Sequence, residues 1–299
     1  MPVSDQTNQE VSPELLRAMQ LKGLEMLLYF QKFCEEHGLL FYFCGGCCIG
    51  TLRHGGFIPW DDDVDVFMPR ADYERLKELW NKHADTQRYA CVYPSRDLCD
   101  HNLFVTIRDT STTFIKPYQQ DLDIPHGLMM DVFPLDAYPL SKWQRRLQVM
   151  WALLYSLFCA QVIPEKHGKA MRILSRIALA LVPFKSWRYA IWRLAERQMS
   201  KYKLEDTDSI TELCAGPGYM KNRYPKEAFA SAVYKEFEGH LLPIPVGYDA
   251  YLRTAFGDYM QLPPAEKQKP QHDAVFVDLE HGYARYKGQY YCKNENKTK

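Results

Sequence analysis

The stretch GGCCIGTLRHGGFIPWDDDVDVF, residues 45–67, joins a glycine pair to four aspartates that lie within five positions. Apolar residues flank the acidic run on both sides, which anchors the run beside a protein core. Carboxylates held this close raise each other's pKa, and partial burial raises it further. A divalent cation relieves that repulsion, and ligands made only of oxygen favour Mg²⁺ or Mn²⁺ over zinc. The sequence therefore predicts a metal site rather than a solvated acidic turn.

The acidic run leads into an apolar segment that predicts a strand over residues 64–67. Alternate side chains of a strand share a face, so Asp61, Asp63 and Asp65 converge if the strand extends back to residue 61. Residues two apart on a strand lie roughly 7 Å apart at the backbone. Their carboxylates are then close enough to hold one ion, or two ions about 4 Å apart.

Gly45 and Gly46 follow an apolar segment that predicts a strand over residues 39–44, and they precede a helix expected over residues 47–53. Glycine lets the backbone approach a phosphate closely, and the first N–H groups of a helix bind anions. A glycine pair alone is a weak signal, because most such pairs are only turns. A glycine pair followed at this distance by Asp-x-Asp on a strand is typical of the nucleotidyltransferase superfamily.

A third carboxylate comes from a later strand in that superfamily. Asp131 has suitable surroundings, because it stands within the apolar run of residues 129–133. Asp136 follows closely and is a rival for the same role. The sequence alone leaves both alternatives open.

The rest of the chain mixes helical and extended patterns. Helical spacing is present over residues 13–37 and from residue 72, and strands are expected over residues 103–109 and 129–133. This mixture predicts an α+β fold, a nucleotidyltransferase-like mixed sheet with flanking helices and a helical insertion. The expected division is a disordered tail (1–12), a catalytic core (13–142), a helical region (143–208) and a C-terminal region that wraps back onto the core (209–299).

Composition excludes some classes of protein. The 37 basic residues equal the 37 acidic residues, so the chain lacks the basic excess of a general nucleic-acid binder. Residues 1–10 contain no apolar run, so we do not expect a secretory signal peptide. The nine cysteines show no regular spacing and are expected to be reduced thiols of a cytoplasmic protein. Cys44 and Cys47 form a C-x-x-C, but no second pair accompanies it to hold zinc, and no thioredoxin-like pattern follows it.

One apolar segment is a candidate for contact with a membrane. Residues 147–163 are almost all apolar and have basic residues before and after them. The segment is short for a bilayer span and is interrupted by Gln148, Ser156 and Gln161. It fits a buried core helix or a helix at the membrane surface, and a transmembrane helix less well. The expected location is therefore the cytoplasm, with a peripheral position on the inner face of the cell membrane as the alternative.

The sequence resembles the LicD family. The blocks that carry the resemblance are Gly50-Thr51-Leu52-Arg53-His54, Gly56-Phe57-Ile58-Pro59-Trp60-Asp61-Asp62-Asp63-Val64-Asp65, Met130-Asp131-Val132-Phe133-Pro134-Leu135-Asp136, Gly257-Asp258-Tyr259-Met260, Pro263-Pro264 and His272. These blocks frame most of the chain, and the Gly56–Asp65 block is long and specific. One departure is that Cys47 and Cys48 stand where the family usually has small or hydroxyl residues, so a side-chain hydrogen bond to phosphate is in doubt there.

The resemblance implies an enzyme of nucleotidyltransferase-like fold that moves a phosphate-linked group from a CDP-linked donor onto a glycan or glycolipid. Phosphocholine from CDP-choline is the best-known cargo, and fukutin-like relatives transfer ribitol phosphate from CDP-ribitol. By position, Asp63 and Asp65 would bind Mg²⁺ or Mn²⁺, with Asp131 as a third ligand. Asp61 or Asp131 would accept the proton of the acceptor hydroxyl.

The remaining expected site residues surround the phosphate. The expected phosphate-binding groups are Gly45, Gly46, Arg53, His54, Arg70 and Lys267, and His272 is expected to orient the phosphate or to act as an acid or base. Trp60 either shapes the loop or stacks on a base or a choline-like cation.

Other functions stay open. The same fold also suits a nucleotidyltransferase that adds a nucleotide from a nucleoside triphosphate to a small molecule or protein. Transfer of phosphoethanolamine or of an alditol phosphate is a further alternative. A non-catalytic glycan- or membrane-binding protein is disfavoured, because a degenerate site should have lost Asp63 or Asp65.

Overall fold

The computed structural model describes residues 11–162, 168–270 and 274–293 of the chain. Its helices are α1 (Pro13–His37), α2 (Gly45–Arg53), α3 (Arg70–His83), α4 (Lys142–Ala160), α5 (Gly168–Leu181), α6 (Lys185–Met199) and α7 (Tyr248–Phe256). Its strands are β1 (Tyr42–Phe43), β2 (Asp65–Pro69), β3 (Tyr89–Val92), β4 (Val105–Asp109), β5 (Thr113–Ile115), β6 (Leu128–Ala137), β7 (Ser209–Glu212), β8 (Tyr224–Pro225), β9 (Ala232–Phe237), β10 (His240–Pro245) and β11 (Phe276–Asp278).

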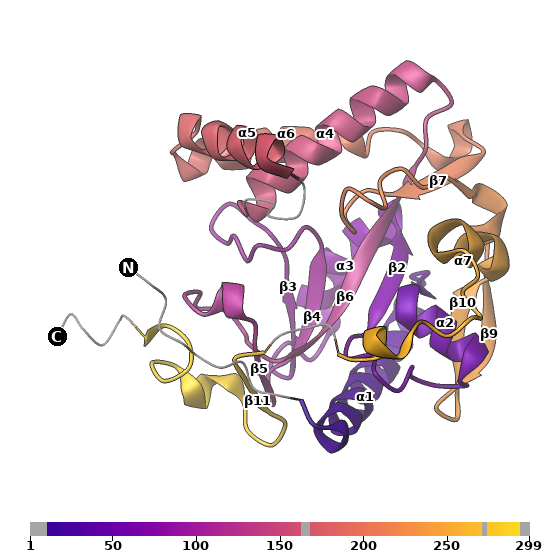
Figure 1. The fold of residues 1–299 in the computed structure, drawn as a ribbon, viewed down its shortest axis with the longest axis vertical. Coiled ribbons are helices and arrows are strands. Elements are labelled where there is room, and N and C mark those ends of the chain that lie inside the picture. Colours follow the sequence, from indigo (N-terminus) through magenta and orange to yellow (C-terminus); the bar gives the residue numbers. More distant parts are fainter. Residues whose placement is uncertain (1–10, 163–167, 271–273, 294–299) are drawn as a thin grey trace.

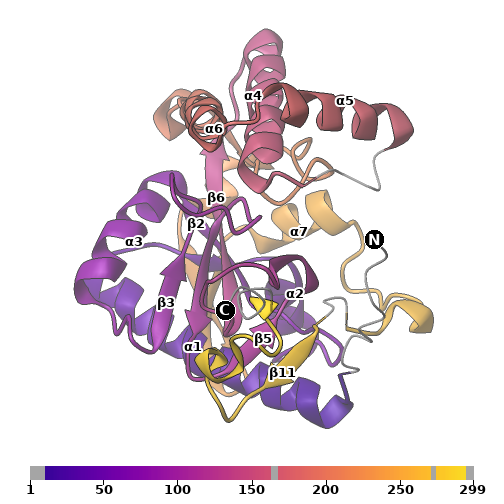
Figure 2. The same ribbon diagram turned by 90° about the vertical axis from the view of Figure 1, so that its left-hand side faces the viewer.

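A mixed sheet of seven strands forms the centre of the molecule (Figure 1). Its main path runs β1-β2-β6-β4-β3, and β7 and β8 extend it from the C-terminal end of β6. Strands β2 and β6 are parallel, whereas the other pairs of this sheet are antiparallel. Helix α3 lies on one side of the sheet, and α2 and α7 lie on the other (Figure 2). The predicted α+β architecture with a mixed sheet is confirmed.

Local signals explain the ends of α1. The side chain of Ser12 accepts a hydrogen bond from the backbone N–H of Leu15, and Pro13 occupies the first turn. Gly38 ends the helix in the left-handed conformation, with φ of 59°. The predicted helix over residues 13–37 is therefore confirmed.

The strands differ more from the prediction. The segment 39–44 forms only the two-residue strand β1, and the predicted strand over residues 129–133 is part of the longer β6. Strand β2 begins at Asp65 and ends at Pro69, so it does not reach back to residue 61. Pairing with β4, β7 and the parallel neighbour β2 lengthens β6, and such long-range pairing leaves no local signal in the sequence.

Large side chains fix the two central strands. Phe30 of α1, Trp80 of α3 and Tyr251 of α7 are all fully buried in the core around β2 and β6. The indole N–H of Trp80 donates to the carbonyl oxygen of Tyr89, 2.9 Å away, which also satisfies its one polar atom. The strands that carry the aspartates are thus held on both sides by packed aromatic side chains.

Helices α4, α5 and α6 gather at one end of the molecule (Figure 1). Helix α4 packs along α6 through a second apolar cluster that includes Tyr155, Phe158 and Trp192. Most of the apolar segment 147–163 belongs to α4, so one face of that segment is buried between helices. Among the described residues, no helix combines the length and the apolar character needed to cross a bilayer.

The C-terminal part of the chain contacts the core at several places. Strands β7 and β8 join the main sheet, β9 and β10 form a hairpin, and β11 pairs with β5. The tail predicted over residues 1–12 falls outside the described residues as far as residue 10.

Candidate active site

The parallel pairing of β2 and β6 brings two predicted carboxylates together. In the register of this pair, Asp65 lies directly beside Asp131. The backbone N–H of Asp131 donates to the carbonyl oxygen of Val64, 2.9 Å away, which continues the pairing beyond the start of β2. Asp131 is therefore the carboxylate that the fold places beside Asp65, whereas the rival Asp136 lies five residues further along β6.

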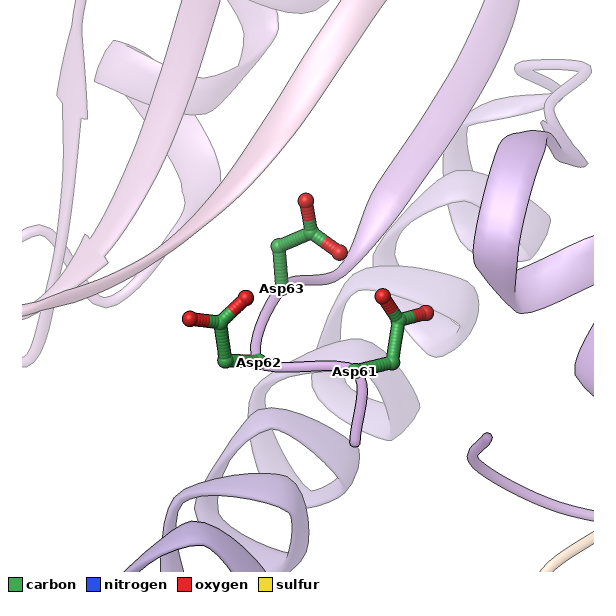
Figure 3. Close-up of side chains that lie close together, drawn as sticks. All are labelled: Asp61, Asp62 and Asp63. Atoms are coloured by element: carbon green, nitrogen blue, oxygen red, sulfur yellow. The ribbon is translucent and has the colours of Figure 1, made fainter. Parts of the chain in front are cut away.

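The other aspartates converge by a different route from the one predicted. Residues 61–64 have no regular secondary structure, so strand alternation does not align Asp61 and Asp63. Even so, Asp61, Asp62 and Asp63 each offer a carboxylate oxygen, and these three atoms lie within 4.8 Å of one another. Figure 3 shows the three side chains on the same side of the loop. Asp62 joins the group because an irregular loop does not send alternate side chains to opposite faces.

Electrostatics makes this acidic cluster unfavourable on its own. The pKa of Asp65 is raised well above its usual value, first by burial and then by the charges of Asp63, Asp131 and Asp61. A site of carboxylate oxygens matches the ligands that Mg²⁺ and Mn²⁺ prefer. The residues present therefore fit a divalent cation, and the cation's charge would reverse the rise in pKa.

Helix α2 begins beside this cluster. Gly45 adopts a left-handed φ of 49°, and its N–H donates to the hydroxyl of Tyr251, 2.9 Å away. A methyl group placed on Gly46 would lie 1.9 Å from a carboxylate oxygen of Asp61, so any larger residue there would displace the Asp61 side chain. The first turn has no side-chain cap and no acidic residue. The positive end of α2 thus adjoins the acidic cluster, where a bound phosphate would meet both.

Lys116 is a site residue that sequence reasoning missed. It lies 8% exposed and lines a small pocket together with Asp62, Asp63 and Asp131. Burial by itself would lower the pKa of Lys116, but the charge of Asp131 and the nearby Tyr118 outweigh it, and the pKa is raised. Lys116 therefore stays charged and places a positive charge beside the carboxylates. A single lysine after the short β5 gave no signal by which sequence reasoning could find it.

A groove of about 520 Å³ opens on the other side of Asp61. Gly46, Arg53 and Trp60 line one wall, and residues of the loop after α7 line the other. The Arg53 guanidinium donates to the carbonyl oxygens of Tyr259 and Gln261, at 2.8 and 3.1 Å, and so fixes that loop. In this structure Arg53 positions the groove wall, while Trp60 is half-buried at its edge.

Arg70, His54 and Lys267, three of the predicted phosphate ligands, line neither the small pocket nor the groove. The guanidinium of Arg70 donates to both carboxylate oxygens of Asp136, at 2.8 and 2.6 Å, at the far end of β2. His54 is exposed at the end of α2, where burial and the charge of Arg53 lower its pKa. Lys267 is exposed in a short 3-10 helix after Pro264. His272 lies outside the described residues.

The cysteines beside the glycine pair are free thiols. Cys44, Cys47 and Cys48 are all buried. Burial raises the pKa of each thiol, so all three stay protonated. Their chemistry is that of small apolar side chains packed behind the start of α2.

Comparison with known proteins agrees with this geometry. A sequence model described as "LicD/FKTN/FKRP, nucleotidyltransferase domain" matches residues 38–139, which contain all five clustered aspartates. The Lipopolysaccharide cholinephosphotransferase LicD of Haemophilus influenzae is 33% identical over 267 residues, covering 86% of this chain and 96% of that protein. Mannosyltransferase regulator 4 of Saccharomyces cerevisiae is 23% identical over 170 residues, covering 52% of this chain and 13% of that protein. The Haemophilus match extends over nearly the whole of both proteins, and the chain therefore belongs to the LicD family.

Proposed function

We propose that this chain transfers phosphocholine from CDP-choline to a hydroxyl group of a cell-surface glycan or its lipid-linked precursor and releases CMP. The observation that supports the proposal most strongly is the cluster of carboxylates at Asp61–Asp63, Asp65 and Asp131, set against the start of α2. The near full-length similarity to a lipopolysaccharide cholinephosphotransferase supports phosphocholine as the cargo. The expected cofactor is Mg²⁺ or Mn²⁺.

The reaction needs charge neutralisation and positioning. The oxygen of the acceptor hydroxyl attacks the phosphorus that bears choline, and the bond from that phosphorus to the bridging oxygen of the diphosphate breaks. The bond electrons leave with CMP, and the hydroxyl proton passes to a carboxylate, for which Asp61 and Asp131 are the candidates. Asp63 and Asp65, with Asp62 and Asp131, would hold the divalent cation, which supplies positive charge against the diphosphate.

Residues of this chain supply the remaining positive groups. The ammonium of Lys116 shares a pocket with Asp131, so it would face the same phosphate as the carboxylates do. The Gly45 N–H already donates to Tyr251, so the N–H groups that follow it in the first turn of α2 would face the phosphate from the other side, beside Asp61. Together these groups bind an anion and hold its phosphorus in line with the incoming hydroxyl.

The groove beside Asp61 suits the choline end of the donor. It combines the aromatic ring of Trp60 with the carboxylates of Asp61 and Asp258. Quaternary ammonium groups bind well over the face of a tryptophan ring, and neighbouring negative charge strengthens that binding. We therefore assign the choline group to this groove, and expect Trp60→Ala to raise the KM for CDP-choline about tenfold while Trp60→Phe retains part of the affinity.

The test is CMP release from a panel of donors. Purified protein is incubated with CDP-choline, CDP-ethanolamine and CDP-ribitol, each with Mg²⁺ and a crude glycolipid extract as acceptor. We expect release from CDP-choline that disappears with EDTA and in the Asp63→Ala, Asp65→Ala double variant. Asp97→Ala, which removes an exposed carboxylate outside the cluster, is the matched control and should leave the rate unchanged.

The outcomes separate the alternatives. Release from another donor alone would keep the reaction and change the cargo to phosphoethanolamine or an alditol phosphate. Folded wild-type protein that releases no CMP from any donor, but releases pyrophosphate from a nucleoside triphosphate, would replace the proposal with nucleotidyl transfer.

A further inference from the structure

Helix α5 and the turn into α6 lie at the helical end of the molecule (Figure 2), and several large apolar side chains are exposed along them. These side chains are 50–73% exposed and comprise Ile173, Leu174, Ile177, Leu181, Phe184 and Trp187. We call this set the α5–α6 patch. The rings of Phe184 and Trp187 lie edge to face with centroids 5.2 Å apart, so the patch continues across the turn.

The patch is the side of α5 that faces away from its packing partner. At about 3.6 residues per turn, Ile173, Leu174, Ile177 and Leu181 fall on one side of a helix. The other side buries Ser175 and Leu179. The outward face of a surface helix is ordinarily polar. Helix α5 is instead apolar both where it packs and where it meets solvent.

Positive charge surrounds this apolar face. Arg172 and Arg176 are exposed on α5 beside the patch, and Lys185 is exposed between Phe184 and Trp187. From residue 172 to residue 194 the sequence has five basic residues and no aspartate or glutamate. The chain as a whole has equal numbers of basic and acidic residues, so this is a local concentration of charge.

The patch is held on a fixed support. The Arg188 side chain donates to the carbonyl oxygens of Val182 and Leu179, at 2.7 and 3.0 Å, and to the side-chain oxygen of Gln161, 2.6 Å away. These hydrogen bonds connect the start of α6 to the end of α5 and to the residue that follows α4. The apolar side chains are therefore presented together as one surface.

We propose that the α5–α6 patch docks on an anionic lipid bilayer, with its apolar side chains among the headgroups and acyl chains and its basic side chains on the lipid phosphates. An apolar face with a basic border and no acidic residue complements such a surface. The proposed contact differs from the sequence expectation, which was the segment 147–163, because α4 packs one face of that segment against α6. The inference is independent of the reaction that the chain catalyses.

Vesicle sedimentation tests the proposal. The full chain is mixed with vesicles of phosphatidylcholine alone, or of phosphatidylcholine with phosphatidylglycerol, and the bound fraction is measured. We expect binding to the anionic vesicles, weakened by salt. Leu174→Asp with Ile177→Asp should lower the partition coefficient at least tenfold, because two charges enter the apolar face. Arg172→Gln with Arg176→Gln should lower it several-fold on anionic vesicles.

Leu241→Asp is the matched control, since Leu241 is an equally exposed leucine on β10, and its binding should equal that of wild type. Circular dichroism and thermal unfolding check the folding of each variant, and Leu174→Gln with Ile177→Gln replaces the aspartate pair if the latter unfolds. Wild-type protein that stays unbound with both vesicles, or that binds as well after the double replacement, overturns the proposal. A dimer that dissociates on the same replacement, without vesicle binding, overturns it in favour of an interface between two copies of this chain.

Discussion

Strands β2 and β6 are neighbours in the sheet, and the acidic side chains at the two ends of this pair differ in how their charge is balanced. At one end Asp65 lies beside Asp131, and three more aspartates lie in the adjoining loop. At the other end Asp136 accepts two hydrogen bonds from Arg70, and both side chains are largely buried. At the second end, Arg70 neutralises the charge of Asp136. At the first end, the negative charge of the clustered aspartates exceeds the positive charge of Lys116. The neighbours of a buried acid, more than the motif that contains it, therefore decide whether its charge is balanced within the protein.

A further buried acid, Glu212, is stabilised in a different way. Glu212 on β7 lies beside Leu135 in the register of β6 and β7. It accepts hydrogen bonds from the hydroxyl of Tyr224 and the amide of Asn222, but no arginine or lysine pairs with it among the described residues. Burial raises the pKa of Glu212 to about 7, although the two hydrogen bonds oppose that rise. This acid is accommodated partly by holding a proton.

Replacing one acid at the first end should have the largest effect. We expect Asp131→Asn to lower the kcat for CMP release by at least ~10³-fold, equivalent to about 4 kcal/mol, because a charge on the metal site and a candidate base are lost. Stability should be unchanged or higher, since repulsion with Asp65 falls. A variant with the wild-type rate would remove Asp131 from the site.

The corresponding change at the second end should act on folding instead. Asp136→Asn removes the shortest of the ion pairs of the largely buried Arg70 and leaves only the longer ones to Glu74 and Glu196, so we expect the free energy of unfolding to fall by about 3 kcal/mol in urea titrations. The folded fraction should keep the wild-type kcat. Asp249→Asn, which breaks an exposed ion pair with Arg253, is the control and should leave stability unchanged. Loss of kcat without loss of stability would contradict the assignment of Asp136 to structure.

A divalent cation should stabilise the protein through the carboxylates of the first end and not through Asp136. At a Mg²⁺ concentration of about 100 Kd, binding to the folded state should add about 2–3 kcal/mol and raise Tm. The rise should vanish in Asp63→Asn and persist in Asp136→Asn. Thermal unfolding with Mg²⁺ and with EDTA measures both, and an equal rise in all three proteins would place the metal elsewhere.

A methyl group at the start of α2 tests the contact between helix and cluster. Gly46→Ala places a carbon against the carboxylate of Asp61, and we expect kcat/KM to fall roughly 30-fold, about 2 kcal/mol. Gly218→Ala is the matched control, because a Cβ there meets nothing within 4 Å. Equal activity of the two variants would show that the carboxylate moves without consequence.

Glu212 should produce the smallest effect, and its sign depends on pH. Between the ordinary glutamate pKa of 4.5 and the folded-state pKa of about 7, the unfolded chain has lost the proton that the folded chain keeps. Stability from this group is thus present at low pH and lost as pH rises through that window. We expect Glu212→Gln to be ~1–2 kcal/mol more stable than wild type at pH 8, with a smaller difference at pH 4. Thermal unfolding across pH checks this, and a constant difference would contradict the raised pKa.

The sequence predicts the parts of this structure that depend on local patterns. The ends of α1 follow from Ser12 and Gly38, and the acidic run correctly predicted a cluster of carboxylates, while the metal bound there stays a prediction. The choice between Asp131 and Asp136 could not be made, since both stand in the same apolar segment. Only the register with β2 distinguishes them, and register depends on contacts distant in sequence.

The same limit explains the residues that were missed or moved. Asp62 was omitted because a strand was expected where the chain forms an irregular loop. Lys116 reaches the cluster through the position of β5, and Arg70 is drawn to Asp136 by a partner 66 residues away. Residue type predicted an ability to bind phosphate, but the fold decides which positive side chain is available for it.

The hydrogen bonds from Arg53 to the groove wall affect how freely the sequence of that wall can vary. Its guanidinium binds the main-chain oxygens of residues 259 and 261, and every amino acid supplies a main-chain oxygen. Substitutions in that loop can therefore change the shape and charge presented to a ligand without loosening the loop itself. Under the proposed function, such substitutions would change which group the groove accepts while the carboxylate cluster stays the same.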